Sequence, residues 1–131
     1  MKRVFLSFIV EDEDHVRGVR LLASSPKYSN LEFYDESVTV AYDSSDAEYI
    51  RSKIRGKLDR ASVTVCLISE TTHNSDWVAW ELRESIDRRM TVIAMAVKGV
   101  NRAVLPKPIK DAGLTFHPWD SDRLGKLIAD A

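Results

Sequence analysis

The chain has 131 residues, 44% of them hydrophobic and 30% charged, a composition typical of one globular domain over residues 1–131. Its 19 basic and 20 acidic residues give a formal net charge of -1, so no long-range field draws it to nucleic acid or a membrane surface. The one cysteine, Cys66, excludes an internal disulfide. The apolar run at 4–10 is too short for a signal peptide or a membrane span, so we expect the cytoplasm.

The first elements follow from hydrophobic patterning. Segment 3–9 is nearly continuous in apolar and β-branched residues, which predicts a strand buried on both faces. The acidic residues at 11–14 suit the N-terminus of a helix, and an apolar stripe at 16–23 continues that helix. A short second strand is expected at 31–35, followed by a loop at 36–44.

The middle of the chain carries the clearest helix and strand. Ser45 and Glu48 have the spacing of a capping box. Behind them, apolar residues recur at spacings of three and four over 47–61, which predicts an amphipathic helix. Segment 62–69 is the strongest strand of the sequence, with Cys66 expected as a small core residue rather than a nucleophile. The next helix is predicted at 75–89.

The remainder completes an alternation of strands and helices. Another buried strand is expected at 91–97, an irregular stretch broken by two prolines at 98–112, a short strand at 114–116 and a last helix at 120–129. Five strands alternating with helices predict an α/β fold, a parallel sheet covered on both faces. The flavodoxin-like strand order 2-1-3-4-5 is the usual solution.

In that order, ligands bind outside the carboxyl ends of the strands, where the first and third strands meet. Three patches are therefore candidates for the site: Ser7-Phe8-Ile9, Asp35-Glu36-Ser37 and Ser69-Glu70. The hydroxyl of Ser7 and the ring of Phe8 could contact a substrate, and Asp35 could bind a ribose hydroxyl. The structural alternatives are a core role for Phe8 and a turn-capping role for Asp35.

The helix predicted at 75–89, capped by Asn74 or Ser75, carries the most informative residue, Glu81. It lies about 60° from the core position Val78 around the helix axis and so borders the buried face. A carboxylate desolvated there interacts strongly with a bound hydroxyl or cation. Trp77 and Trp80 flank it and could offer an aromatic wall to a flat ring. The simpler reading is an acid at the helix dipole between core tryptophans.

The residues as a set resemble the TIR-like domains, most closely the bacterial branch of the Thoeris anti-phage system. The resemblance covers essentially the whole chain and is carried by three motifs: Arg3-Val4-Phe5-Leu6-Ser7-Phe8, Phe33-Tyr34-Asp35 and Asp76-Trp77-Val78-Ala79-Trp80-Glu81-Leu82. It implies that Glu81 is catalytic, that NAD is the substrate, and that no cofactor is needed. The products would be nicotinamide and ADP-ribose, or a cyclic ADP-ribose messenger for a downstream effector.

The resemblance also implies self-association through TIR–TIR contacts, but the family's partner-contacting loop corresponds here to 37–44, which lacks glycine and proline. This departure from the family pattern argues against assembly through that loop. The alternative to an enzyme is a non-catalytic TIR-like scaffold or nucleotide-binding module that acts by self-assembly. A phosphorelay receiver is disfavoured because Ser69 occupies the region where its third strand needs an aspartate. The three histidines have no ligand spacing, which argues against a metal site. The five isolated glycines argue against a phosphate-binding loop.

Overall fold

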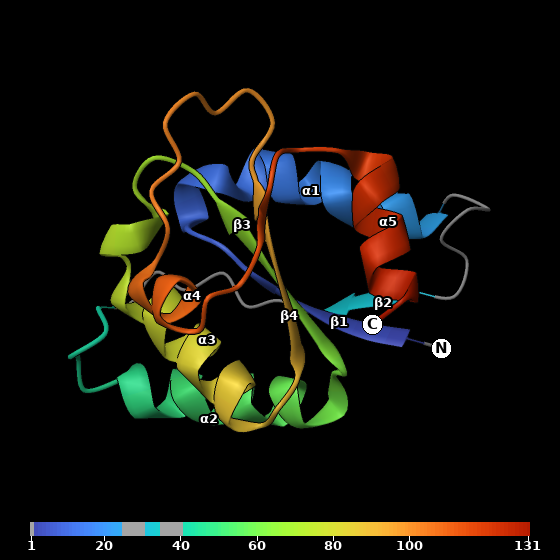
Figure 1. Ribbon diagram of the computed structural model, residues 1–131. Coiled ribbons are helices and arrows are strands. Elements are labelled where there is room, and N and C mark those ends of the chain that lie inside the picture. Colours follow the sequence, from blue (N-terminus) through green and yellow to red (C-terminus); the bar gives the residue numbers. More distant parts are fainter. Residues whose placement is uncertain (1, 25–30, 35–40) are drawn as a thin grey trace.

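The computed structural model describes residues 2–24, 31–34 and 41–131, and at its centre is a parallel sheet with the strand order β2-β1-β3-β4-β5 (Figure 1). This order and the α/β class confirm the prediction. The five strands are β1 (Lys2–Ser7), β2 (Leu31–Tyr34), β3 (Val63–Ile68), β4 (Thr91–Ala96) and β5 (Phe116–His117).

Helices cover both faces of the sheet. Figure 1 shows α1 and α5 on one face, and α2, α3 and α4 on the other. The α-helices are α1 (Glu13–Leu21), α2 (Ala47–Arg60), α3 (Asp76–Asp87), α4 (Lys107–Asp111) and α5 (Ser121–Ala129). Short 3-10 turns are η1 (Val10–Asp12), η2 (Leu22–Ser24) and η4 (Thr72–Asn74).

Alternation along β1 assigns its side chains to the two layers. Val4 and Leu6 belong to the core cluster that includes residues of α1 and α5. Phe5 belongs instead to a cluster with α2 and α3, and Ser7 falls on the same face because successive side chains of a strand point to opposite sides. All four side chains are at most 1% exposed. The strand therefore delivers one buried hydroxyl, that of Ser7, to the layer that contains α3.

Two local predictions are wrong. The stretch 98–112 contains α4, since Pro106 precedes this helix and Pro108 occupies its first turn, where the missing N–H costs nothing. The capping box at Ser45 is absent: α2 begins at Ala47, and its N-cap residue makes no side-chain hydrogen bond to the helix. The Glu48 carboxylate pairs instead with two arginines, with Arg51 at its Oε2 and Arg55 at its Oε1.

Element ends also differ from the predictions by one or two residues. β1 ends at Ser7 rather than Ile9, and β5 covers Phe116–His117 rather than 114–116. The predicted patch at 35–37, and the loop at 36–44 up to Val40, lie outside the described residues.

Candidate functional site

The sheet order creates a switch point between β1 and β3. These two strands are adjacent, and Ser7 is in register with Cys66. The other neighbour of β1 is β2, on one side of the sheet, and the other neighbour of β3 is β4, on the opposite side. The connections that leave their carboxyl ends therefore diverge, and in α/β folds ligands bind at such an edge. η1 and α1 follow β1, whereas η4 and α3 follow β3.

The start of α3 is fixed by a side-chain cap. Ser75 is the N-cap residue, and its hydroxyl oxygen accepts a hydrogen bond from the backbone N–H of Val78 at 3.1 Å, which confirms one of the two predicted caps. Val78 and Leu82 are fully buried in a cluster with residues of β3 and β4. These two anchors, four residues apart, hold α3 against the sheet and set the direction of the intervening Glu81.

Glu81 is buried, with 3% of its surface exposed. The hydroxyl of Ser7 donates a hydrogen bond to its Oε1 at 2.6 Å. Short bonds from a hydroxyl to a carboxylate are stronger than those between neutral groups. The bond thus fixes the orientation of the carboxylate and offsets part of the cost of its burial.

A second polar contact ties the next turn of α3 to β3. The hydroxyls of Thr64 and Ser85 are 2.8 Å apart, and Ser85 also donates to the backbone carbonyl of Glu81 at 2.8 Å. Thr64 and Ser85 are both fully buried. Ser85 therefore holds the backbone carbonyl of Glu81, while Ser7 holds its carboxylate.

Cys66 lies beneath this site on β3. It is fully buried, as the sequence predicts, and burial raises the pKa of its thiol. The negative charge of Glu81 raises that pKa further. The thiol consequently stays protonated at neutral pH and cannot act as a thiolate nucleophile.

Trp77, one turn before Glu81, is half-buried, whereas Trp80 is 8% exposed and packs in the core with Phe5 and Leu58. The two indoles meet edge to face at 6.0 Å. Trp77 also meets the ring of Tyr42 edge to face at 5.2 Å. Of the two predicted wall tryptophans, Trp77 is thus the more exposed.

The structure brings some predicted site residues together and separates others. Ser7, Glu81 and Trp77 lie on the α2–α3 side of the sheet. Phe8 packs against the cluster that includes residues of α1 and α5, so it falls on the opposite side. Asp35 lies outside the described residues. The substrate-binding roles of Ser7, Phe8, Asp35 and Trp77 stay predictions.

The patch at Ser69 has a structural role. Its hydroxyl donates to Asp12 Oδ2 at 2.7 Å, and its backbone N–H donates to Thr72 Oγ1 at 2.7 Å. These bonds connect the end of β3 to η1 and η4. Sequence reasoning missed Tyr42 and Arg51, which contact Trp77, because their segments are far from α3 in the chain and follow no motif.

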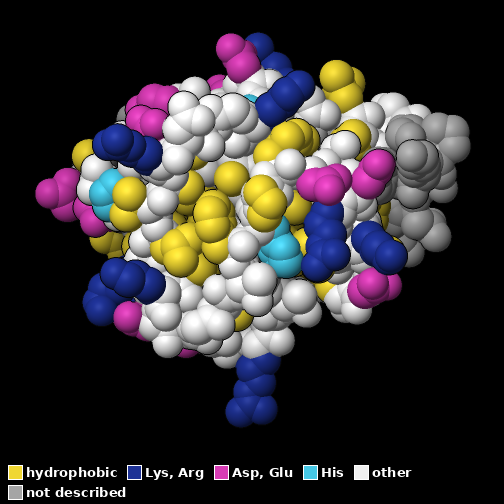
Figure 2. All heavy atoms as spheres, turned by 45° about the horizontal axis from the view of Figure 1, so that its top comes forward, with side chains coloured by type: hydrophobic (Ala, Val, Ile, Leu, Met, Phe, Trp, Pro, Cys, Tyr) yellow, Lys and Arg dark blue, Asp and Glu magenta, His cyan; other side chains and the backbone are white. Residues whose placement is uncertain are grey.

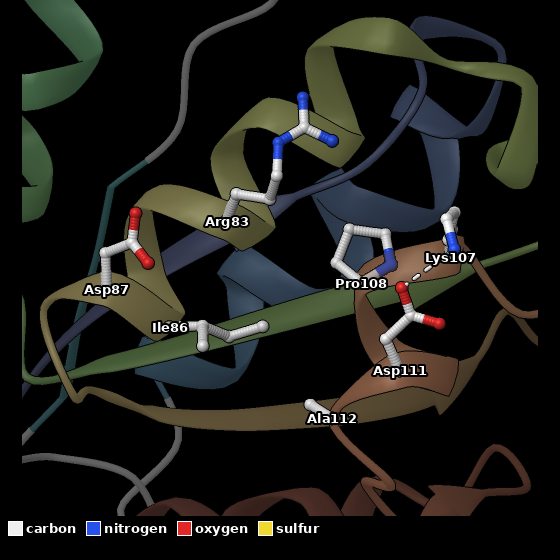
Figure 3. A pocket seen from close by; sticks show the side chains of 7 residues that line it. All are labelled: Arg83, Ile86, Asp87, Lys107, Pro108, Asp111 and Ala112. Carbon is white, nitrogen blue, oxygen red and sulfur yellow. Dashed lines mark ion pairs between the residues drawn. The ribbon is translucent and has the colours of Figure 1, made fainter.

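A cavity of about 340 Å³ lies between α3 and α4 (Figure 3). Its lining residues are Arg83, Ile86, Asp87, Lys107, Pro108, Asp111 and Ala112. Lys107 and Asp111 form an ion pair at 3.0 Å across one rim. Since Glu81 is not a lining residue, this cavity is separate from the carboxylate.

The surface carries mixed charge. Figure 2 shows hydrophobic side chains gathered in the middle of one face, with acidic and basic side chains around them and neither sign dominant. Within the described ranges, every helix is too short or too polar to traverse a bilayer. In the same ranges, no three His, Cys, Asp or Glu side chains gather closely enough to hold a metal ion.

The comparison with protein families shows to which family the chain belongs. The model of the Thoeris protein ThsB TIR-like domain matches residues 5–102. The chain belongs to this family. Among solved structures, the TIR-like domain is similar to the TIR domain of the Toll-related receptor TRR-2 from Hydra magnipapillata, with a TM-score of 0.64 and 14% identity, over 96% of this chain and 97% of that one. That likeness shows the fold. No curated protein matches the sequence.

Membership confirms the resemblance seen in the sequence and supports a TIR-domain role in defence. The matched residues cover the end of β1 and all of α2, β3, α3 and β4, and so contain Ser7, Trp77 and Glu81. The family match thus includes all three of these predicted site residues.

Proposed function

We propose that this TIR-like domain cleaves NAD at the bond between nicotinamide and ribose, and makes an ADP-ribose or cyclic ADP-ribose-type signal in anti-phage defence. The observation that carries the proposal is the buried Glu81 carboxylate, oriented by Ser7 beside the half-buried Trp77 at the β1–β3 switch point. A buried acid held in one orientation at a ligand-binding edge is characteristic of a reactive group.

The chemistry suits a single carboxylate. In NAD the nicotinamide is a pyridinium, so when the C1′–N bond breaks it leaves as a neutral molecule with the bonding electron pair and needs no proton. The ribose then carries oxocarbenium-like positive charge, as in glycoside cleavage. The negative charge of Glu81 stabilises that positive charge, and a preoriented carboxylate does so without rearrangement.

The second half of the reaction sets the product. Attack of water on C1′, with loss of a proton, gives ADP-ribose. Attack by another nucleophilic atom of the same ADP-ribosyl group gives a cyclic product. In this proposal Trp77 stacks on the planar ring of the substrate and Ser7 keeps the carboxylate in place, while Phe8 and Asp35 are the further predicted contacts.

The alternative is a TIR-like scaffold that binds a nucleotide or assembles with further copies without turnover. The α3–α4 cavity favours it, because an apolar floor rimmed by Arg83, Lys107, Asp87 and Asp111 suits contact with another chain. In the enzymatic reading, self-association would instead complete or activate the site, and the product would reach a downstream effector in the cytoplasm.

The test is incubation of purified protein with NAD at increasing protein concentrations, followed by chromatography of the nucleotides. E81Q keeps the size of the side chain and removes its charge. E84Q is the matched control, since Glu84 lies three residues later on the same helix. We expect nicotinamide release by the wild type and E84Q but not by E81Q, with all three folded by circular dichroism. Equal release by all three would exclude Glu81, and no release by the wild type at any concentration would favour the scaffold.

A further inference from the structure

Arg51 of α2 lies between the segment that precedes this helix and the helix that carries Glu81. Its guanidinium carbon is 4.3 Å from the centroid of the Tyr42 ring and 5.4 Å from the centroid of Trp77. Its Nη2 donates to the backbone carbonyl of Tyr42 at 2.7 Å. Its Nη1 lies 3.5 Å from Glu48 Oε2, and its side chain is 18% exposed. We call Tyr42, Arg51 and Trp77 the Arg51 cluster.

The Arg51 cluster joins three parts of the chain. Tyr42 belongs to the segment at 41–46, Arg51 to α2 and Trp77 to α3, and Figure 1 shows α2 and α3 side by side. A planar guanidinium can face a ring while its N–H groups donate in its own plane, which an ammonium cannot do. Its attraction to an aromatic ring grows when the cation is partly desolvated, as Arg51 is.

We propose that Arg51 is a positioning residue for the substrate: it fixes the ring of Trp77 in the orientation that receives the planar ring of NAD. This inference rests on the proposed function. Trp77 and Glu81 are four residues apart on α3 and therefore project from the same side of the helix. Arg51 acts through Trp77 and Tyr42, so it should govern substrate binding more than the chemical step.

The chain contains a matched control, Arg55. It lies one turn later on α2, and its guanidinium carbon is 5.4 Å from the centroid of Trp80. It pairs with Glu48 at 2.9 Å and with Glu84 at 3.3 Å. Its aromatic partner is the core tryptophan, which is 8% exposed. Arg55 therefore has the same chemistry as Arg51, but its own aromatic contact is with Trp80 rather than Trp77.

The first experiment needs no turnover. We expect R51Q to change the tryptophan emission spectrum and this change to vanish in a W77F background, because it arises at Trp77. The change caused by R55Q should persist in the W77F background. Identical spectra for wild type and R51Q, or a change by R51Q that survives W77F, would overturn the inference. Thermal unfolding verifies that each variant is folded.

The second experiment separates binding from chemistry. We expect R51Q to raise KM for NAD about tenfold and leave kcat nearly unchanged. R51K keeps the charge but loses the planar stack, so it should show most of the same rise, whereas R55Q should show none. An unchanged KM in R51Q, or an equal rise in R55Q, would overturn the inference. If the wild type does not cleave NAD, the proposed function fails, while the spectra still decide whether Arg51 orients Trp77.

Discussion

Glu81 and Glu84 are three residues apart on α3, yet their surroundings differ in kind. Glu81 is 3% exposed and receives a hydrogen bond from the neutral hydroxyl of Ser7. The Glu84 side chain is 22% exposed and lies 3.3 Å from Arg55 and 3.4 Å from Arg88. Both arginines contact Oε1 of Glu84, so positive charge balances this carboxylate. Helical geometry predicts that Glu81 borders the buried face, and the structure adds that the two acids have different partners, a neutral hydroxyl for Glu81 and two arginines for Glu84.

The largest effect should come from moving the Glu81 carboxylate without removing its charge. E81D shortens the side chain by one methylene, which draws the carboxylate away from both Ser7 and the substrate. We expect the rate of nicotinamide release to fall about 100-fold, because a displacement of about 1 Å is that costly in a preorganised site. The measurement is the initial rate at saturating NAD. E84D should stay close to the wild-type rate. An equal loss of rate in E81D and E84D would contradict a special role for Glu81.

Removing the hydroxyl that orients Glu81 should have the next largest effect. S7A deprives a buried carboxylate of a donor, and we expect the free energy of unfolding to fall by about 1–3 kcal/mol. Urea unfolding measures this change, and kcat should fall with it. S62A is the matched control, because Ser62 is exposed and its contact with the Arg3 carbonyl is long, at 3.4 Å. A similar loss in S7A and S62A would show that the bond to Glu81 contributes nothing.

A smaller effect on stability is expected when the charge of Glu84 is removed. E84Q removes the negative charge between Arg55 and Arg88, and the free energy of unfolding should fall by about 0.5–1 kcal/mol, as for partly exposed ion pairs. The loss should shrink when urea unfolding is repeated in 1 M salt, since exposed charges are screened. A loss that is insensitive to salt would contradict an electrostatic role for Glu84.

The smallest expected effect on stability comes from a buried basic side chain, that of His15. Its Nε2 is buried without a hydrogen-bond partner among the described residues, and its ring meets Trp119 edge to face at 4.4 Å. Burial lowers the pKa of His15 below its ordinary value of 6.5; Lys98 lowers it further, whereas Asp12 opposes the shift. As the pH falls, His15 is therefore protonated in the unfolded chain before it is protonated in the folded protein.

The stability of the protein should accordingly decline as the pH falls below about 6.5, where the unfolded state binds more protons. H15Q should flatten this part of the profile of unfolding free energy against pH. Urea unfolding at pH 7.5, 6.5 and 5.5 measures it. H73Q provides the control, because His73 is exposed. A decline of equal slope in wild type and H15Q would exclude His15 as its cause.

Most of the fold could be predicted because its signals are local. The buried strands read as apolar runs, and the strand order follows from the alternation of strands with helices. The helix α4 was missed because Pro106 and Pro108 resemble breakers when read singly, although proline is tolerated in a first turn. The capping box failed because Asp46, not Ser45, is the N-cap residue of α2, and the Glu48 carboxylate pairs with Arg51 and Arg55 instead.

The site was only partly predictable. Helical geometry placed Glu81 at the border of the buried face, but its partner Ser7 lies 74 residues away and is identified only by the packing of α3 on β1. The separation of Phe8 from Ser7 is implicit in strand alternation, because neighbouring residues of a strand point to opposite faces. The contact of Arg51 with Trp77 depends on how α2 and α3 lie together, which no local pattern specifies.

The two polar contacts between α3 and the sheet, Ser7 with Glu81 and Thr64 with Ser85, have a consequence for regulation. The two contacts lie one helical turn apart, so α3 cannot slide or rotate on the sheet without breaking both hydrogen bonds. A signal that switches this domain on or off would thus be expected to leave α3 in place. In the proposed function, such a signal would act on substrate binding or on assembly, while Glu81 keeps its orientation.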